Sequence, residues 1–150
     1  MPSLKRNVGH KTFVDSSVVF AAVLSPSGGS FRIFREARSR NIALCVTRYV
    51  IDEVREGLQE KYPGSVEAFD SLFLHFPVSV LPDPPDRVVR KYLRLLPPDD
   101  VPILAGAVAG GAQELITLDR KHFLNNVVLK AGVPFLEIIT PGDFIQKYFK

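Results

Sequence analysis

The chain has 150 residues, of which 46% are hydrophobic and 23% are charged, and its 19 lysines and arginines against 16 aspartates and glutamates give a formal net charge of +3. This length is typical of one domain that buries its own core, and this composition excludes a disordered chain. With a single cysteine, Cys45, no intrachain disulfide or Cys-x-x-Cys metal or redox site can form, which favours a reducing, cytoplasmic compartment.

Five short apolar segments alternate with longer helical patterns, which predicts an α/β fold with a parallel sheet. A basic N-terminal arm, residues 1–11, is expected to be flexible, and residues 12–150 are expected to form one domain. Strands are predicted over residues 12–14, 42–46, 78–81, 115–118 and 135–139. Helices are predicted over residues 30–40, 47–61, 65–73, 85–95, 100–110, 120–130 and 141–148.

No segment of the sequence predicts contact with a membrane. The longest apolar stretches, such as residues 18–24 and 101–109, are far shorter than the ~20 residues of a membrane-spanning helix. No apolar segment follows the basic residues Lys5, Arg6 and His10, so neither a signal peptide nor an anchor is expected. The small positive net charge permits a nucleic-acid partner without identifying one.

Two aspartates directly follow predicted strands. Asp15 comes after the strand over residues 12–14, and Asp119 comes after the strand over residues 115–118. In an open parallel sheet, ligands bind at the carboxyl ends of the strands, close to the point where the strand order reverses. Both aspartates are therefore candidates for a site at this edge, although either one alone could simply cap a helix or close a turn.

Two further acidic residues lie on predicted helices. Asp100, next to Asp99, begins a helix, and taken alone it could be an ordinary N-cap. Glu53 lies at the margin of the buried face of another helix, and Gly57, one turn further on, is expected to leave open space beside it. Because Glu53 alone is more typical of a solvated helix position, the functional hypothesis rests on the four carboxylates of Asp15, Glu53, Asp100 and Asp119 together.

Carboxylates that converge on one edge of a sheet need a cation. Unit charges ~4 Å apart repel one another by several kcal/mol at a protein-like dielectric. Arg120 and Lys121 follow Asp119 closely, but no histidine or arginine accompanies the carboxylates within their local motifs. A site made of oxygen atoms suits Mg²⁺ or Mn²⁺ rather than Zn²⁺. Such ions activate water and stabilise the charge that develops on a phosphodiester during hydrolysis.

Six segments that include these residues follow one another along the chain: residues 13–19 (FVDSSVV), 24–29 (LSPSGG), 51–54 (IDEV), 99–107 (DDVPILAGA), 110–119 (GGAQELITLD) and 139–144 (ITPGDF). In order and spacing they resemble the motifs of PIN-domain ribonucleases, in particular the VapC-like toxin components of prokaryotic toxin–antitoxin pairs. The resemblance spans nearly the whole chain, from Phe13 to Phe144.

The resemblance implies a three-layer α/β/α sandwich with a central five-stranded parallel sheet. It also implies a Mg²⁺- or Mn²⁺-dependent endonuclease that cleaves single-stranded RNA. Its metal ligands, or the activators of its attacking water, would be Asp15, Glu53, Asp100 and Asp119. Ser17 and Thr117 would be supporting groups that orient these ligands. As partners it implies an antitoxin protein that holds the enzyme inactive, and a second copy of the chain in a homodimer.

The sequence departs from the family pattern in two places and leaves two choices of residue open. Ser17 stands where many members have asparagine, and Leu118 fills a position that is often small. Asp99 and Asp100 are adjacent, so either could be the ligand. We prefer Asp100 because the isoleucine and alanines of the motif then fall at the expected spacing, and Asp99 is kept as a supporting residue. Of Asp52 and Glu53 we prefer Glu53, because Ile51 and Val54 are then core residues and Asp52 faces solvent.

RNA contacts are expected beside the acidic site. Arg120 and Lys121 are favoured, because the arginine clusters of residues 32–40 and 87–94 are more typical of solvated helix faces. For His122 a surface or capping position is favoured over a role as general acid. Apolar residues that a core could also consume suggest a surface for the antitoxin: Phe31, Phe34, Leu72, Phe73 and Phe76.

Two other functions remain as alternatives. The first is a catalytically inactive PIN-like module that binds RNA or protein, and the retention of all four carboxylates disfavours it. The second is a receiver-like or phosphatase-like domain, which also carries an aspartate after its first strand. Phosphatases of that kind need a second aspartate two residues later, where this chain has Ser17.

Overall fold

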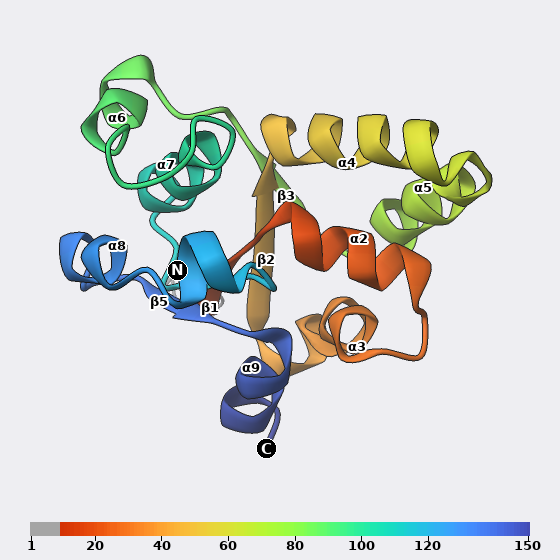
Figure 1. Cartoon of the computed structure of the whole chain (residues 1–150). Helices are drawn as coiled ribbons and strands as arrows, with labels where there is room; N and C mark the ends of the chain where they lie inside the picture. The colour runs from red at the N-terminus through yellow and green to blue at the C-terminus, as the bar shows by residue number, and fades with distance from the viewer. Residues whose placement is uncertain (1–9) are drawn as a thin grey trace, which may run out of the picture.

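The computed structural model describes residues 10–150 and contains one sheet of five parallel strands (Figure 1). The strands are β1 (His10–Val14), β2 (Ile42–Thr47), β3 (Ser79–Leu81), β4 (Glu114–Ile116) and β5 (Glu137–Ile139), in the order β3-β2-β1-β4-β5. The predicted parallel sheet is confirmed. β1 begins at residue 10, two residues before the predicted strand, so residues 10 and 11 belong to the sheet and not to the predicted flexible arm. The rest of that arm, residues 1–9, lies outside the described part of the chain.

Helices cover both sides of this sheet, which confirms the predicted three-layer arrangement. In Figure 1, α2, α3, α4 and α5 lie to the right of β2, and α6, α7 and α8 lie to its left. The helices are α2 (Ser16–Leu24), α3 (Gly29–Glu36), α4 (Arg48–Lys61), α5 (Val66–His75), α6 (Asp86–Lys91), α7 (Val101–Ala109), α8 (Val127–Gly132) and α9 (Pro141–Tyr148). Short helical turns are η1 (Arg38–Arg40), η2 (Pro63–Ser65) and the π-type turn η3 (Arg120–Leu124).

Four helical expectations need correction. The helix predicted over residues 30–40 ends at Glu36 and is followed by the separate turn η1. Helix α2 is absent from the predicted elements because its sequence is apolar on nearly every side and shows no amphipathic period. The helix predicted over residues 120–130 is divided into η3 and α8, because the side chain of Asn126 caps α8 by accepting a hydrogen bond from the N–H of Leu129. The helix predicted over residues 85–95 ends at Lys91.

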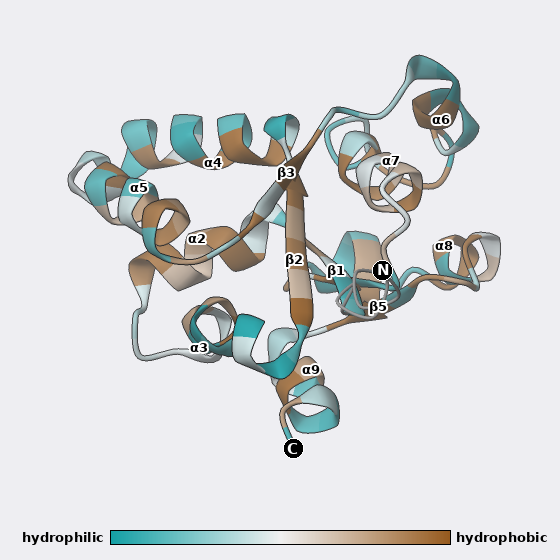
Figure 2. Ribbon diagram, turned by 180° about the vertical axis from the view of Figure 1, so that it is seen from behind, coloured by the Kyte–Doolittle hydropathy of each residue, from teal (hydrophilic) through white to brown (hydrophobic). Residues whose placement is uncertain are grey.

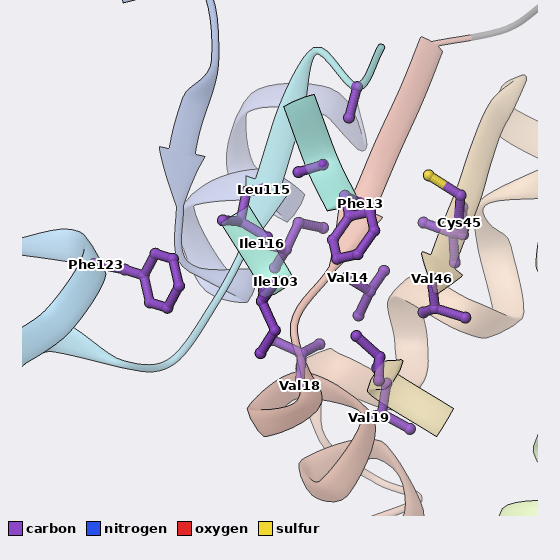
Figure 3. Close-up of a cluster of buried hydrophobic side chains, with 14 of the residues drawn as sticks. Phe13, Val14, Val18, Val19, Cys45, Val46, Ile103, Leu115, Ile116 and Phe123 are labelled. Atoms are coloured by element: carbon purple, nitrogen blue, oxygen red, sulfur yellow. The ribbon is translucent and has the colours of Figure 1, made fainter. Parts of the chain in front are cut away.

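The core joins β1 and β4 to helices on both faces of the sheet. Figure 3 shows Phe13 and Val14 of β1 near Leu115 and Ile116 of β4, with Val18 and Val19 of α2 and Ile103 of α7 around them, and all of these residues are at most 2% exposed. Helix α4 is amphipathic, and its apolar side faces α2 in Figure 2. Within residues 10–150, no single helix is long and apolar enough to span a membrane. Helices α2 and α3 meet the criteria of length and composition only when they are taken together, and the pair is bent by 97°.

The space beside Gly57 is filled, contrary to the prediction of an open area there. A Cβ atom at this position would overlap with Cζ of Phe20, whose ring comes from α2. Gly57 therefore allows α2 and α4 to approach each other closely. This contact holds α4, which carries Glu53, against the helix that follows Asp15.

Replacing Gly106 with alanine is expected to destabilise the protein by about 1–2 kcal/mol, because overpacking a core costs roughly 1–3 kcal/mol and alanine returns at most ~1 kcal/mol of helix propensity. The new Cβ would lie 2.8 Å from Cγ2 of Thr47, the residue that caps α4. Urea unfolding measures the loss. Gly142→Ala is the matched control, since a Cβ at Gly142 has no atom within 4 Å, and an equal loss in both variants would contradict the packing argument.

Candidate active site

Asp15 lies at the point where the strand order of the sheet reverses. The chain leaves β1 toward β2 on one side, whereas β4 and β5 lie on the other side of β1. Asp15 directly follows β1, is 4% exposed, and its N–H donates to the carbonyl of Ile116 at the end of β4 over 3.0 Å. The carboxyl group is therefore fixed at the edge of the sheet where ligands bind in this class of fold.

Two hydroxyl groups hold the Asp15 carboxylate. The Oγ atom of Ser17 and the Oγ1 atom of Thr117 each donate to its Oδ2 atom over 2.7 Å. The same two hydroxyls accept hydrogen bonds from the N–H groups of Leu118 and Asp119, each over 3.0 Å. Two of the three residues that the sequence predicts as supporting groups thus contact Asp15, and through them Asp15 is tied to the loop that carries Asp119.

Asp100, Asp119 and His122 form a second group at the same edge. The Nδ1 atom of His122 lies 3.0 Å from Oδ2 of Asp100 and 3.1 Å from Oδ2 of Asp119. The N–H of His122 donates to Oδ1 of Asp119 over 2.9 Å. One ligand atom from each of the three residues lies within 4.8 Å of the others, a separation that a single metal ion can span.

His122 is the site residue that the sequence pattern undervalues. The pattern favours a surface or capping histidine, but the half-buried ring lies between the carboxylates of Asp100 and Asp119. The local signal is its position three residues after Asp119, which caps η3 and so turns the ring back toward its own carboxylate. A positively charged ring at this place would offset the negative charges of Asp100 and Asp119, whose sequence motifs contain no positively charged residue.

Glu53 reaches the site from α4. Its Oε1 atom accepts a hydrogen bond from the hydroxyl of Ser16, the residue after Asp15. One turn earlier, the hydroxyl of Tyr49 donates to the carbonyl of Asp99 over 2.8 Å, which joins α4 to the loop before α7. Burial raises the pKa of Tyr49 to about 12, with the carboxylates of Glu53, Asp99 and Asp100 adding to the shift, so the phenol remains a donor.

Asp99 and Asp100 differ in where their side chains lie. Asp99 is exposed and contributes its carbonyl to the bond with Tyr49, whereas Asp100 is half-buried and contacts His122. Only Asp100 belongs to the group of possible metal ligands found among residues 10–150. The preference for Asp100 as the ligand stays a prediction, and this difference in position is what a test of it can use.

The carboxylates of the site repel one another. Burial is the main cause that raises the pKa of Asp15, and the charge of Asp119 raises it further. The hydrogen bonds from Thr117 and Ser17 act in the opposite direction and lower this pKa. Burial also raises the pKa of Glu53, where the charges of Asp15 and Asp100 contribute. For Asp100 the rise comes from burial and from Asp119 and Asp15, and His122 opposes it. A cation at this edge would relieve both the repulsion and the cost of burial.

The donor set fits a divalent metal. Asp15, Glu53, Asp100 and Asp119 lie close enough for their charges to contribute to the raised pKa values of Asp15, Glu53 and Asp100, and hard oxygen ligands suit Mg²⁺ and Mn²⁺. The nitrogen of His122 beside Asp100 and Asp119 is also a ligand type that Mn²⁺ accepts.

Without a divalent metal, the free energy of unfolding is expected to fall as the pH rises above about 4. The folded protein binds protons at Asp15, Glu53 and Asp100 to higher pH than the unfolded chain, whose values are close to 3.8 and 4.5. The stability that these groups contribute is fully present at a pH below their pKa values in the unfolded chain. It is lost as the pH rises through their raised pKa values in the folded protein, by at most about 1.4 kcal/mol per pH unit for each proton released.

Urea unfolding in EDTA and in Mn²⁺, at pH 5 and pH 8, tests this expectation. Mn²⁺ should remove most of the fall at pH 8, and Asp15→Asn should reduce the fall in EDTA. Glu36 and Glu137 act in the opposite direction, because their pKa values are lowered. The comparison with Asp15→Asn separates their effect, and identical pH profiles for the variant and the unchanged protein would contradict the argument.

The basic residues divide into paired and unpaired groups. Arg32, Arg35 and Arg40 of the first cluster surround Glu36 and lower its pKa to about 2, so three of its four arginines share one carboxylate. Arg120 and Lys121 are exposed directly after Asp119 and form no ion pair within residues 10–150. Their position keeps them as candidates for phosphate contacts.

The apolar surface that the sequence suggests is present in part. Phe31, Leu72 and Phe76 line a groove of about 670 Å³ between α2, α3 and α5. Phe34 belongs to the core instead, because it is 2% exposed and packs edge-on against Phe73. The groove therefore rests on three of the five predicted residues.

Comparisons with known proteins give one family and one fold. A sequence model of the PIN domain matches residues 11–121 of the chain. The structure of PAE2754 from Pyrobaculum aerophilum is similar with a TM-score of 0.65 and 18% sequence identity, over 93% of this chain and 96% of that one. The structure of VapBC2 from Rickettsia felis, bound to a DNA fragment from their promoter, gives a TM-score of 0.63 and 15% identity, over 87% and 98% of the two chains.

A third structure is that of VapC20 from Mycobacterium tuberculosis, a toxin that cleaves the sarcin-ricin loop. It gives a TM-score of 0.55 and 15% identity, over 74% of this chain and 92% of that one. At such low identities these similarities show the fold. A search of curated proteins finds none that matches the chain.

Proposed function

The chain belongs to the PIN-domain family, and from this premise we propose that it is a metal-dependent endoribonuclease that cleaves single-stranded RNA. The observation that carries the proposal is the convergence of Asp15, Glu53, Asp100 and Asp119 at the carboxyl edge of the sheet, beside its reversal point. We further propose that it acts in the cytoplasm as the toxin of a toxin–antitoxin pair.

The four carboxylates have different places in the proposed mechanism. Asp15 is the most rigid ligand, because the hydroxyls of Ser17 and Thr117 fix one of its oxygens. Asp100 and Asp119 approach each other across His122 and can ligate from the open side of the site. Glu53, held by Ser16, can orient the water that attacks the phosphorus. A bound Mg²⁺ or Mn²⁺ would make this water more acidic and offset the charge that develops on the phosphodiester.

The surround of the acidic edge has to hold a polyanion. Arg120 and Lys121 are the proposed phosphate contacts, because they follow Asp119 directly and project from η3 as exposed side chains. Asp99 supports the site through its backbone, since its carbonyl binds Tyr49 of the helix that carries Glu53.

Cleavage assays with single-stranded RNA test the proposed function. The protein is incubated with RNA in Mn²⁺, in Mg²⁺ and in EDTA, beside the Glu53→Gln variant, which keeps an oxygen that can accept the bond from Ser16. We expect cleavage with either metal and a strong loss in EDTA and in the variant. Tight RNA binding without cleavage, unaffected by EDTA, would instead support the alternative of an inactive binding module.

An antitoxin and a second copy of the chain are the proposed protein partners. The support for an antitoxin is the similarity to VapBC structures and the apolar groove between α2, α3 and α5. Co-purification of the chain with the product of the neighbouring gene, and its mass in solution with and without that product, test both partners.

A further inference from the structure

A cavity of about 520 Å³ adjoins the acidic edge, between the start of α3, the start of α9 and the loop after β4. We propose that this cavity binds the RNA nucleotide next to the cleaved phosphodiester, with its phosphate at the helix starts and Arg120 and with its base or sugar on apolar side chains. The inference rests on the proposed function and names a subsite that positions the strand.

The cavity is continuous with the residues that hold Asp15. Leu118, which lines it, lies between Thr117 and Asp119, and its N–H donates to the hydroxyl of Ser17. Ala21 lines it one helical turn after Ser17. A nucleotide in the cavity would therefore be followed directly by a phosphodiester at the carboxylates.

Unpaired donors gather on one side of the cavity. No side chain caps α3, and the N–H groups of Gly29 and Ser30 at its start have no acceptor within residues 10–150. Helix α9 lies against α3 (Figure 1), and the N–H of Gly142 in its first turn is likewise free among these residues. Two helix starts facing one space create a positive potential there, and they favour an anion such as a phosphate.

Ser30 and Arg120 point to a ligand independently of the helix ends. Ser30 lines the cavity and is only 7% exposed, yet its hydroxyl forms no hydrogen bond within the described residues. The hydroxyl is not sealed in the core, because no side-chain oxygen or nitrogen within residues 10–150 is both buried and unpaired, so it is open to a partner that enters the cavity. Arg120 lines the same space without an ion pair in that part of the chain, and a guanidinium is well suited to bind a phosphate.

The remaining wall is apolar and suits the base or the sugar. Ala21, Leu118 and Pro141 line this part, and Leu118 is 45% exposed although it lies beside the acidic edge. A neighbouring cavity of about 600 Å³ shares Arg120 and Thr140 and is also lined by Lys130 and Lys150. The strand could continue there, because these lysines can bind the next phosphates.

Titration with uridine 5′-monophosphate and with inorganic phosphate, followed by amide chemical shifts in EDTA, tests the subsite without any cleavage. We expect the nucleotide to shift the amides of Gly29, Ser30 and Gly142, and phosphate alone to shift them less. Gly142→Glu should remove these shifts, since a carboxylate at the cavity repels the phosphate, whereas Gly142→Gln should keep them. No shift at these amides, or equal behaviour of the two variants, would overturn the proposal.

Binding of a single-stranded oligoribonucleotide in EDTA gives a second measurement. Arg120→Ala should lower the slope of log affinity against log salt by about 0.7, as expected for one lost phosphate contact on a single strand. An unchanged slope would count against the subsite. If the nucleotide shifts the amides but the protein cleaves no RNA, the subsite is supported and the proposed nuclease is refuted. If the protein cleaves RNA but the nucleotide causes no shifts, the nuclease is supported and the subsite is refuted.

Discussion

Replacing Asp15 with asparagine is expected to lower RNA cleavage by more than about 100-fold while leaving the protein at least as stable. Loss of groups that only orient metal ligands typically costs 10–100-fold, and Asp15 is itself a proposed ligand. It is also the carboxylate with the least freedom, because it is 4% exposed and two hydroxyls hold one of its oxygens.

The expected stability of this variant follows from the same contacts. The amide oxygen of asparagine can accept the hydrogen bonds from Ser17 and Thr117, and the buried charge is removed. Asp15 makes no side-chain capping bond to α2, so no cap is lost. In EDTA at pH 8, the melting temperature should stay the same or rise.

The measurements are kcat/KM for an RNA substrate and thermal unfolding in EDTA, with Glu60→Gln as the control. Glu60 is exposed near the end of α4 and forms no hydrogen bond or ion pair through its side chain within residues 10–150, so its variant should change neither quantity much. Full activity of Asp15→Asn would remove Asp15 from the mechanism. A large fall in its melting temperature would show that the negative charge itself stabilises the fold.

The sequence predicts the parts of this site that follow from chain order. Asp15 comes directly after β1 and Asp119 three residues after the end of β4, and parallel strands place such residues at one edge whatever the details of packing. The hydroxyl of Thr117 reaches Asp15 across 102 positions of sequence, and here only the resemblance to a family indicated the contact. A pairing between distant residues leaves no periodic signal in a single sequence.

Three features depend on packing and could not be read from local patterns. Helix α2 is buried on most sides, so its sequence has no polar face to mark a helical period. Phe20 fills the space beside Gly57 only because α2 runs against α4. His122 enters the site because η3 turns at Asp119, and a helix continuing to residue 130 would place the ring differently.

Asp99→Asn and Asp100→Asn form the pair of variants with the sharpest expected contrast. Asp100→Asn should lower kcat/KM by at least about 100-fold, as for a direct metal ligand, whereas Asp99→Asn should stay within about twofold. The two residues are adjacent and carry the same side chain, so overall charge and composition change equally. They differ in geometry, since Asp100 lies 3.0 Å from His122 and faces Asp119, while the exposed Asp99 contributes its backbone carbonyl to Tyr49.

Mn²⁺ affinity, measured by the rise in melting temperature with metal concentration, extends the comparison beyond catalysis. Ligand binding to the folded state alone stabilises it by about 2.7 kcal/mol at a concentration 100 times the dissociation constant. This stabilisation should persist in Asp99→Asn and shrink in Asp100→Asn, where one carboxylate is missing from the group with Asp119 and His122. The reverse order would place the metal ligand at Asp99 and leave Asp100 as the residue that only begins α7.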